Sequence, residues 1–129
     1  ERTPTLEMKT ETGAMRVATP ETTALDLLRY LEGAGHLGNV TTVLGELAEK
    51  IDGERLAQVA RTEGKLPTAQ RLGHLLDHVG AGEAARPLAA WIDERRPRFV
   101  PLRPDHSVKR AAKDGRWRVL VNEEIEAEA

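Results

Sequence analysis

The hydrophobic pattern of the chain changes period twice, from strand-like alternation to helical spacing and back again. Residues 5–10 and 14–18 alternate apolar and polar positions, and the Glu-Thr-Gly triplet between them suits a hairpin turn. Helical spacing begins at Thr19-Pro20, because threonine can accept a bond from a free helix N–H and proline suits the first helical position. The segment 20–32 has leucine and alanine around most of its circumference, so we expect it to be the central helix of the domain.

Four further helices are predicted downstream. The segment 39–51 has a clear apolar stripe, formed by Val40, Val43, Leu44, Leu47, Ala48 and Ile51. Asp52 is placed to cap a short third helix, and Gly64 to end it. The fourth helix, 68–79, has its apolar side at Leu72, Leu75, Leu76 and Val79. The fifth contains Leu88 and Ile92, with Pro87 either at its start or at a bend.

Three prolines, Pro97, Pro101 and Pro104, break up the segment after the fifth helix, so residues 99–102 are predicted to form an edge strand. A loop over 103–116 and a final strand over 117–121 follow. This order predicts an α+β fold, with a small sheet from N- and C-terminal strands packed against about five helices. We expect residues 1–129 to be a single domain, and an N-terminal part of the protein to lie outside them.

Composition narrows the class of protein. Hydrophobic residues make up 40% of the chain and charged residues 31%, as in globular proteins. No segment approaches the roughly 18 consecutive apolar residues of a membrane helix, and no signal peptide is recognisable, so we expect no membrane partner and a cytoplasmic location. The absence of cysteine excludes disulfides, thiolate nucleophiles and cysteine-ligated zinc.

The net charge of −2 conceals a strongly basic segment at 95–118, which has nine lysines and arginines against two aspartates. Guanidinium and ammonium groups can pair with phosphates or with carboxylates of a partner protein. The alternative is a solvated loop, neutralised by the acidic residues after 122. Trp91, Phe99 and Trp117 flank the segment, and we expect them in the core. The candidate partner-binding residues are Arg95, Arg96, Arg98, Arg103, Lys109, Arg110, Lys113 and Arg116.

Three patterns resemble enzyme or nucleotide-binding motifs, and each lacks the context that the chemistry needs. His74 and His78 have the spacing of zinc ligands, but both lie opposite the leucine stripe of their helix and are expected to face solvent. Glu7 and Lys9 match half of a nuclease site without its second acidic residue. The G-x-G-x-x-G string at 33–38 follows a helix instead of a strand. We therefore expect no catalytic, metal or cofactor site and no enzyme activity.

Several segments in series resemble a known family. They are Arg16–Tyr30, the glycine-rich link 33–38, Asn39–Leu47, Glu54–Ala57 and Ala69–Gly80. Their order and spacing are similar to the C-terminal domain of AbiEi-type antitoxins, which belong to bacterial type IV toxin–antitoxin and abortive-infection systems. The resemblance covers residues 14–121. It rests on the order and spacing of the whole series, because no single motif in it is diagnostic.

The resemblance implies a non-catalytic antitoxin domain that neutralises a nucleotidyltransferase-like toxin, directly or indirectly, in phage defence. It also implies an N-terminal winged helix-turn-helix for promoter DNA, and no such segment is recognisable before Leu6. The alternative function is a nucleic-acid-binding module of a transcriptional regulator, which would use the basic segment 95–118.

Overall fold

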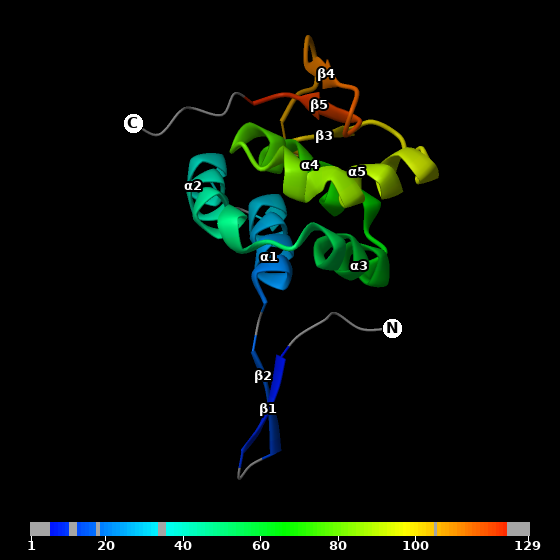
Figure 1. The fold of residues 1–129 in the computed structure, drawn as a ribbon. Helices are drawn as coiled ribbons and strands as arrows, with labels where there is room; N and C mark the ends of the chain where they lie inside the picture. The colour runs from blue at the N-terminus through cyan, green and yellow to red at the C-terminus, as the bar shows by residue number, and fades with distance from the viewer. Residues whose placement is uncertain (1–5, 11–12, 18, 34–35, 105, 124–129) are drawn as a thin grey trace.

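A β-hairpin opens the part of the chain that the computed structural model describes, which is residues 6–10, 13–17, 19–33, 36–104 and 106–123. β1 (Leu6–Thr10) pairs antiparallel with β2 (Gly13–Val17), and Met8 lies opposite Met15. The predicted hairpin is confirmed, although Glu11 and Thr12 of its turn lie outside the described residues. Figure 1 shows the hairpin as the first element before the helices.

The C-terminal strands form a second sheet of their own, whereas the sequence predicted one sheet shared by both ends of the chain. β5 (Val119–Val121) is central, with β3 (Val100–Pro101) parallel to it on one side and β4 (Ala112–Asp114) antiparallel on the other. The short turn after β1 lets β1 and β2 satisfy each other's backbone groups immediately. β4 lies within the predicted loop and completes the second sheet. The α+β class and the edge position of β3 are confirmed.

Local capping explains where the first helix begins. α1 (Pro20–Gly33) starts at Pro20, and Thr19 Oγ1 accepts a hydrogen bond from the Thr22 backbone N–H at 3.2 Å. Thr22 Oγ1 in turn accepts one from the Thr19 backbone N–H at 3.0 Å, so the two threonines cap reciprocally. Glu21 is buried in the first turn, and its Oε2 accepts a bond from the Asp52 N–H at 2.7 Å. The predicted start of this helix is confirmed.

The second helix ends earlier than its apolar stripe predicted. α2 (Leu37–Leu47) begins two residues earlier than expected and passes into a 3₁₀ turn, η1 (Ala48–Lys50). Val43, assigned to the stripe, is exposed, while Leu37, Val40 and Leu44 are buried. Because its last turn is 3₁₀, the predicted helix over 39–51 is interrupted at Leu47.

α3 (Gly53–Glu63) has the two ends that the sequence predicted. Asp52 Oδ1 accepts bonds from the backbone N–H groups of Glu54 and Arg55, at 3.0 and 3.2 Å. Gly64 ends the helix with φ = 69°, a left-handed conformation in which glycine has no Cβ to clash. Both assignments are confirmed because capping depends on residues adjacent in sequence.

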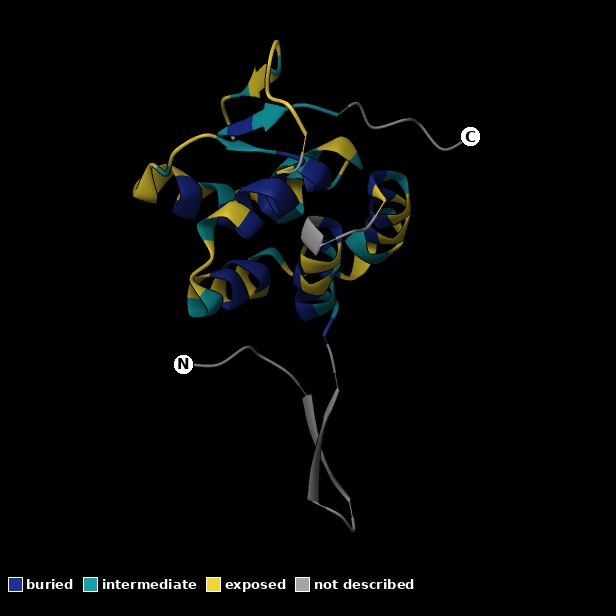
Figure 2. Cartoon of the chain, turned by 180° about the vertical axis from the view of Figure 1, so that it is seen from behind, coloured by how far each residue is buried: buried dark blue, intermediate teal, exposed yellow. Residues whose placement is uncertain are grey.

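α4 (Leu66–His78) and α5 (Gly82–Arg95) form the middle of the molecule. α5 begins at Gly82, so Pro87 lies inside the helix and not at its start. In Figure 1 the three-stranded sheet lies on one side of α4 and α5, and α1 and α3 lie on the other. Figure 2 shows that the buried residues line the inner sides of these helices. The largest fully buried side chains include Leu28, Leu31, Leu44, Leu56, Leu72, Leu75, Leu76, Leu88, Ile92, Leu102 and Trp117.

Candidate functional site

One face of α4 carries polar side chains toward the three-stranded sheet. These side chains belong to Gln70, His74 and Asp77, and Gly73 lies between them on the same face. The leucine stripe on the opposite side, Leu72, Leu75 and Leu76, is fully buried among the helices. α4 is therefore covered on two sides, and its polar face contacts the sheet whose strands β3 and β4 lie within the basic segment.

Gln70 fixes the start of two strands. Its side chain is fully buried, and Nε2 donates to the carbonyl oxygens of Arg98, Trp117 and Arg118 at 2.9, 3.2 and 3.0 Å. These carbonyls precede β3 and β5, and a neighbouring α4 side chain, Arg71 Nε, donates to the carbonyl of Pro101 at 2.8 Å. The Arg118 carbonyl also accepts from the Val100 N–H at 3.0 Å, so Gln70 binds at the point where β3 and β5 begin to pair.

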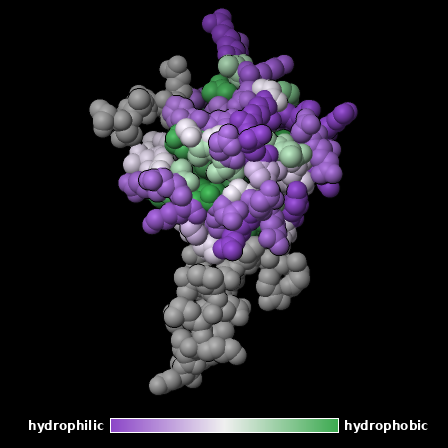
Figure 3. Space-filling view, in the orientation of Figure 1, coloured by the Kyte–Doolittle hydropathy of each residue, from purple (hydrophilic) through white to green (hydrophobic). Residues whose placement is uncertain are grey.

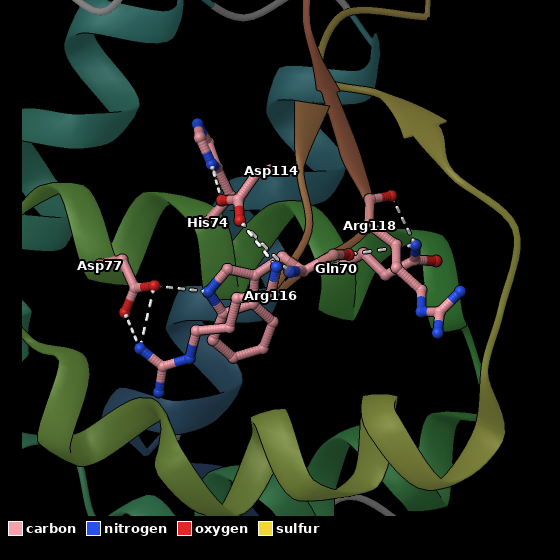
Figure 4. Close-up of polar contacts among 7 residues, drawn as sticks. Gln70, His74, Asp77, Asp114, Arg116 and Arg118 are labelled. Carbon is pink, nitrogen blue, oxygen red and sulfur yellow. Dashed lines mark hydrogen bonds and ion pairs between the residues drawn. The ribbon is translucent and has the colours of Figure 1, made fainter. Parts of the chain in front are cut away.

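His74 lies under β4 and not in solvent, so the prediction that it would face solvent is wrong. Its Nδ1 is 2.6 Å from Asp114 Oδ2, and both side chains are largely buried (Figure 4). Asp114 Oδ1 accepts from the backbone N–H groups of Arg116 and Trp117, at 3.1 and 3.4 Å. Asp114 thus joins the β4–β5 turn to α4. His78 is exposed, as predicted.

Trp117 is the apolar anchor between the sheet and α4, and its predicted place in the core is confirmed. The ring is fully buried and lies directly over Gly73, where a Cβ atom would approach ring carbon Cε3 to 2.1 Å. Its Nε1 donates to Asp77 Oδ2 at 2.7 Å, and Asp77 also accepts from Arg116 Nη1 at 2.8 Å. Figure 4 shows this pairing at the end of α4. Glycine is therefore required at position 73, because the Trp117 ring packs too close to the helix to leave room for a Cβ atom.

Three arginines of the basic segment have structural partners. Arg103 is buried, with its Nε 3.5 Å from Glu123 Oε1 and its backbone bonded in both directions to the Asn122 amide. Arg116 pairs with Asp77, and Arg118 Nη1 donates to the carbonyl of Pro97 at 3.4 Å. Two of the eight candidate residues, Arg103 and Arg116, thus take part in holding the fold.

The other six candidates are exposed, and no ion pair reaches them within the part of the chain that the structure describes. We call them the unpaired basic group: Arg95, Arg96, Arg98, Lys109, Arg110 and Lys113. Phe99, which was expected in the core, is 37% exposed beside them, and Lys113 Nζ lies 5.7 Å from its ring centroid. Trp91 is buried, as predicted. None of the six is therefore engaged in an ion pair with another described residue.

Backbone conformation distinguishes some of these arginines further. Arg96, Arg110 and Arg118 have φ of 48°, 63° and 56°, the non-glycine residues with positive φ in the described chain. A side chain in this region costs on the order of 1 kcal/mol relative to glycine, which would fit without strain. All three positions lie in the basic segment and carry arginine. Because this backbone conformation favours glycine, it does not explain why arginine is present there.

Sequence reasoning missed the polar face of α4. Its signal was present in the spacing of Gln70, His74 and Asp77, but His74 and Asp77 were considered only as part of a zinc motif. The described residues contain no group of three or more side chains that could hold a metal ion. Glu7 and Lys9 lie on β1, and Gly33 and Gly38 lie on consecutive helices, not after a strand. No helix in the described part of the chain is long and apolar enough to span a membrane.

The fold and the site together define a small α+β domain whose accessible chemistry is a group of surface cations, held in place by a polar helix face. Residues 1–78 match the model of the AbiEi antitoxin C-terminal domain. The chain belongs to this family. That membership indicates an antitoxin role in a toxin–antitoxin system. The match ends with α4, so the basic segment lies beyond it.

A solved structure shares the fold. The crystal structure of the RV2827C protein from Mycobacterium tuberculosis is similar, with a TM-score of 0.57 and 18% sequence identity. The similarity covers 78% of this chain and 33% of that protein, so this chain spans about a third of its length. No curated protein matches the chain in sequence.

Proposed function

We propose that this domain is the non-catalytic antitoxin part of a bacterial type IV toxin–antitoxin system and that it neutralises a nucleotidyltransferase-like toxin. Membership of the AbiEi antitoxin C-terminal domain family carries the proposal. Promoter binding by a winged helix-turn-helix, a role in phage defence and a cytoplasmic location belong to the same proposal. A nucleotidyltransferase-like reading frame beside that of the antitoxin would support the proposal.

The unpaired basic group is the surface that supports protection. Its six side chains are exposed and without ion pairs among the described residues, whereas Arg103 and Arg116 are engaged with Glu123 and Asp77. A charged side chain that already has a buried or hydrogen-bonded partner loses that partner when it binds elsewhere. A cation that has no ion pair among the described residues gives up no such partner on binding, so these six side chains make contact at a lower cost.

The experiment is rescue of cells that express the toxin. We reverse four charges together, Arg98→Glu, Lys109→Glu, Arg110→Glu and Lys113→Glu. The matched control reverses four exposed cations around α3, which are Lys50, Arg55, Arg61 and Lys65. Both variants change the net charge equally, so a general electrostatic effect would appear in both.

We expect the first variant to lose protection and the control to keep it, with both remaining folded by circular dichroism. The four substituted residues are exposed, and surface substitutions of this kind change stability by roughly 0.5 kcal/mol each. Full rescue by a stably folded first variant would refute the role of this surface. Failure of the unsubstituted domain to rescue at all would refute the antitoxin proposal itself.

A further inference from the structure

The sheet has one face toward α4, and the strand residues assigned to its opposite face are exposed or half-buried. Val119 is buried, and its pairing partners Val100 and Asp114 share its face, where Asp114 contacts His74. Residues paired across neighbouring strands project to the same face, and successive residues alternate. The opposite set, one residue along in each strand, is Pro101, Leu120 and Lys113. These three and Phe99, two residues before Pro101, form what we call the outer sheet face.

The outer sheet face combines an aromatic ring with cations. The contact of Lys113 Nζ with the Phe99 ring, at 5.7 Å, joins the two edge strands across this face. Phe99 is 37% exposed, and Pro101 and Leu120 are half-buried. Figure 3 shows apolar residues between hydrophilic ones at the sheet end of the molecule. An exposed cation–π contact is weak, so a ligand that offers both an anion and a flat ring can replace it.

The residues around the ring are positively charged. Arg98 precedes Phe99 and is exposed without an ion pair among the described residues, whereas Arg118, in the turn before β5, donates to the carbonyl of Pro97. Lys113, in contact with the ring, and Arg98, its neighbour in sequence, are therefore the exposed cations at Phe99.

We propose that the outer sheet face binds single-stranded nucleic acid, with a base stacked on Phe99 and neighbouring phosphates held by Arg98 and Lys113. An exposed aromatic ring within a basic surface is the arrangement by which proteins hold unpaired strands. A duplex offers the same phosphates but keeps its bases stacked on one another, so it cannot use the ring. An acidic protein would meet the cations and would gain no stacking contact from Phe99.

The proposal shares Arg98 and Lys113 with the proposed antitoxin surface, but its test does not depend on a toxin. Fluorescence anisotropy of the 129-residue chain would be measured with labelled oligouridylate and oligothymidylate of about 12 nucleotides and with a duplex of equal length. Titrations between roughly 50 and 200 mM salt give the number of phosphates released from their counterions. The two single strands distinguish RNA from DNA as the source of the ligand.

Substitution of Phe99 is expected to change the affinity for single strands, and substitution of a cation is expected to change the salt dependence of binding. Phe99→Ala should weaken single-strand binding roughly five- to hundredfold, the loss of one stacked base, with the salt slope unchanged. Lys113→Gln should make the slope of log K against log salt less negative by about 0.7, the value for one phosphate on a single strand. Phe99→Trp should retain binding and Phe99→Leu should not, because leucine restores apolar area but no ring. Tyr30→Ala is the matched control, since Tyr30 is an aromatic residue 54% exposed on α1.

Preference for a single strand, with loss in Phe99→Ala and recovery in Phe99→Trp, supports the proposal. Equal or tighter binding of the duplex with no effect of Phe99→Ala would overturn it and leave the cations as a duplex-backbone or protein surface. Absence of binding at the lowest salt would also overturn it. Either failure leaves the rescue experiment with toxin unaffected, so the two proposals are judged separately.

Discussion

Replacement of Gly73 by alanine tests whether Trp117 holds the sheet on α4 as the structure shows. A Cβ atom at position 73 would lie 2.1 Å from Cε3 and 2.2 Å from Cζ3 of Trp117. Carbon atoms attract at about 3.5–4.0 Å, so the ring or the helix must move by about 1.5 Å. Neither can move freely, because the ring is fully buried and its Nε1 is bonded to Asp77.

The expected loss of stability follows from three terms. Overpacking a dense core costs roughly 1–3 kcal/mol, and complete loss of a buried tryptophan costs about 3–5 kcal/mol. Alanine in the middle of a helix gains up to about 1 kcal/mol over glycine, which offsets only part of this. We therefore expect Gly73→Ala to lower the free energy of unfolding by about 2 kcal/mol, and Tm by roughly 5–10 °C for a domain of this size.

Gly45→Ala is the matched control, because its added Cβ would meet Val79 at 4.0 Å, an ordinary contact, within α2. It should stabilise the protein by about 0.5–1 kcal/mol. Urea unfolding followed by circular dichroism measures both variants. In a Trp117→Leu background, Gly73→Ala should become neutral or favourable, since the clashing ring is gone. A Gly73→Ala protein as stable as the unsubstituted one would show that the Trp117 ring does not rest on α4.

Two further predictions concern the same region. Asp77→Ala should cost about 1–3 kcal/mol, because it leaves the buried Trp117 Nε1 without an acceptor, whereas Asp26→Ala, at an exposed ion pair with Arg29, should change stability by less than about 1 kcal/mol. Equal effects of the two substitutions in urea unfolding would contradict the buried hydrogen bond. Arg96→Gly should stabilise the domain by about 1 kcal/mol, because the α5 C-cap has φ = 48°. Thermal unfolding of Arg96→Gly that matched or fell below the unsubstituted protein would contradict the strain.

The helices were predictable because their signals are local. Thr19 and Asp52 cap helices through backbone groups two or three residues away, and Gly64 ends one through its own conformation. β4 was not predictable by these rules. Its three residues, Ala112–Asp114, are too few to show an alternation of apolar and polar positions. Its position depends on pairing with β5 and on the contact of Asp114 with His74, forty residues earlier in the sequence.

The candidate site was predictable only as a set of charges. The sequence located the cations of residues 95–118, but nothing local separates Arg110, which is exposed, from Arg116, which is bonded to Asp77. That separation follows from the packing of α4 against the sheet. Phe99 is likewise of a residue type usually found in the core, and its exposure follows from the face of the sheet on which its side chain lies.

The polar face of α4 connects the family region of the chain to its basic surface. The match to the AbiEi antitoxin domain ends at residue 78, the last residue of α4, so Gln70 and Asp77 lie inside it while the groups that they bind lie beyond it. A fragment that ended there would lose α5, which packs against both α3 and α4, and would expose the fully buried Gln70 amide. Unpaired buried polar groups and exposed leucines both cost stability, so we expect a fragment of residues 1–78 to be less stable than the whole chain. The basic surface is thus positioned by side chains of the family's own helix.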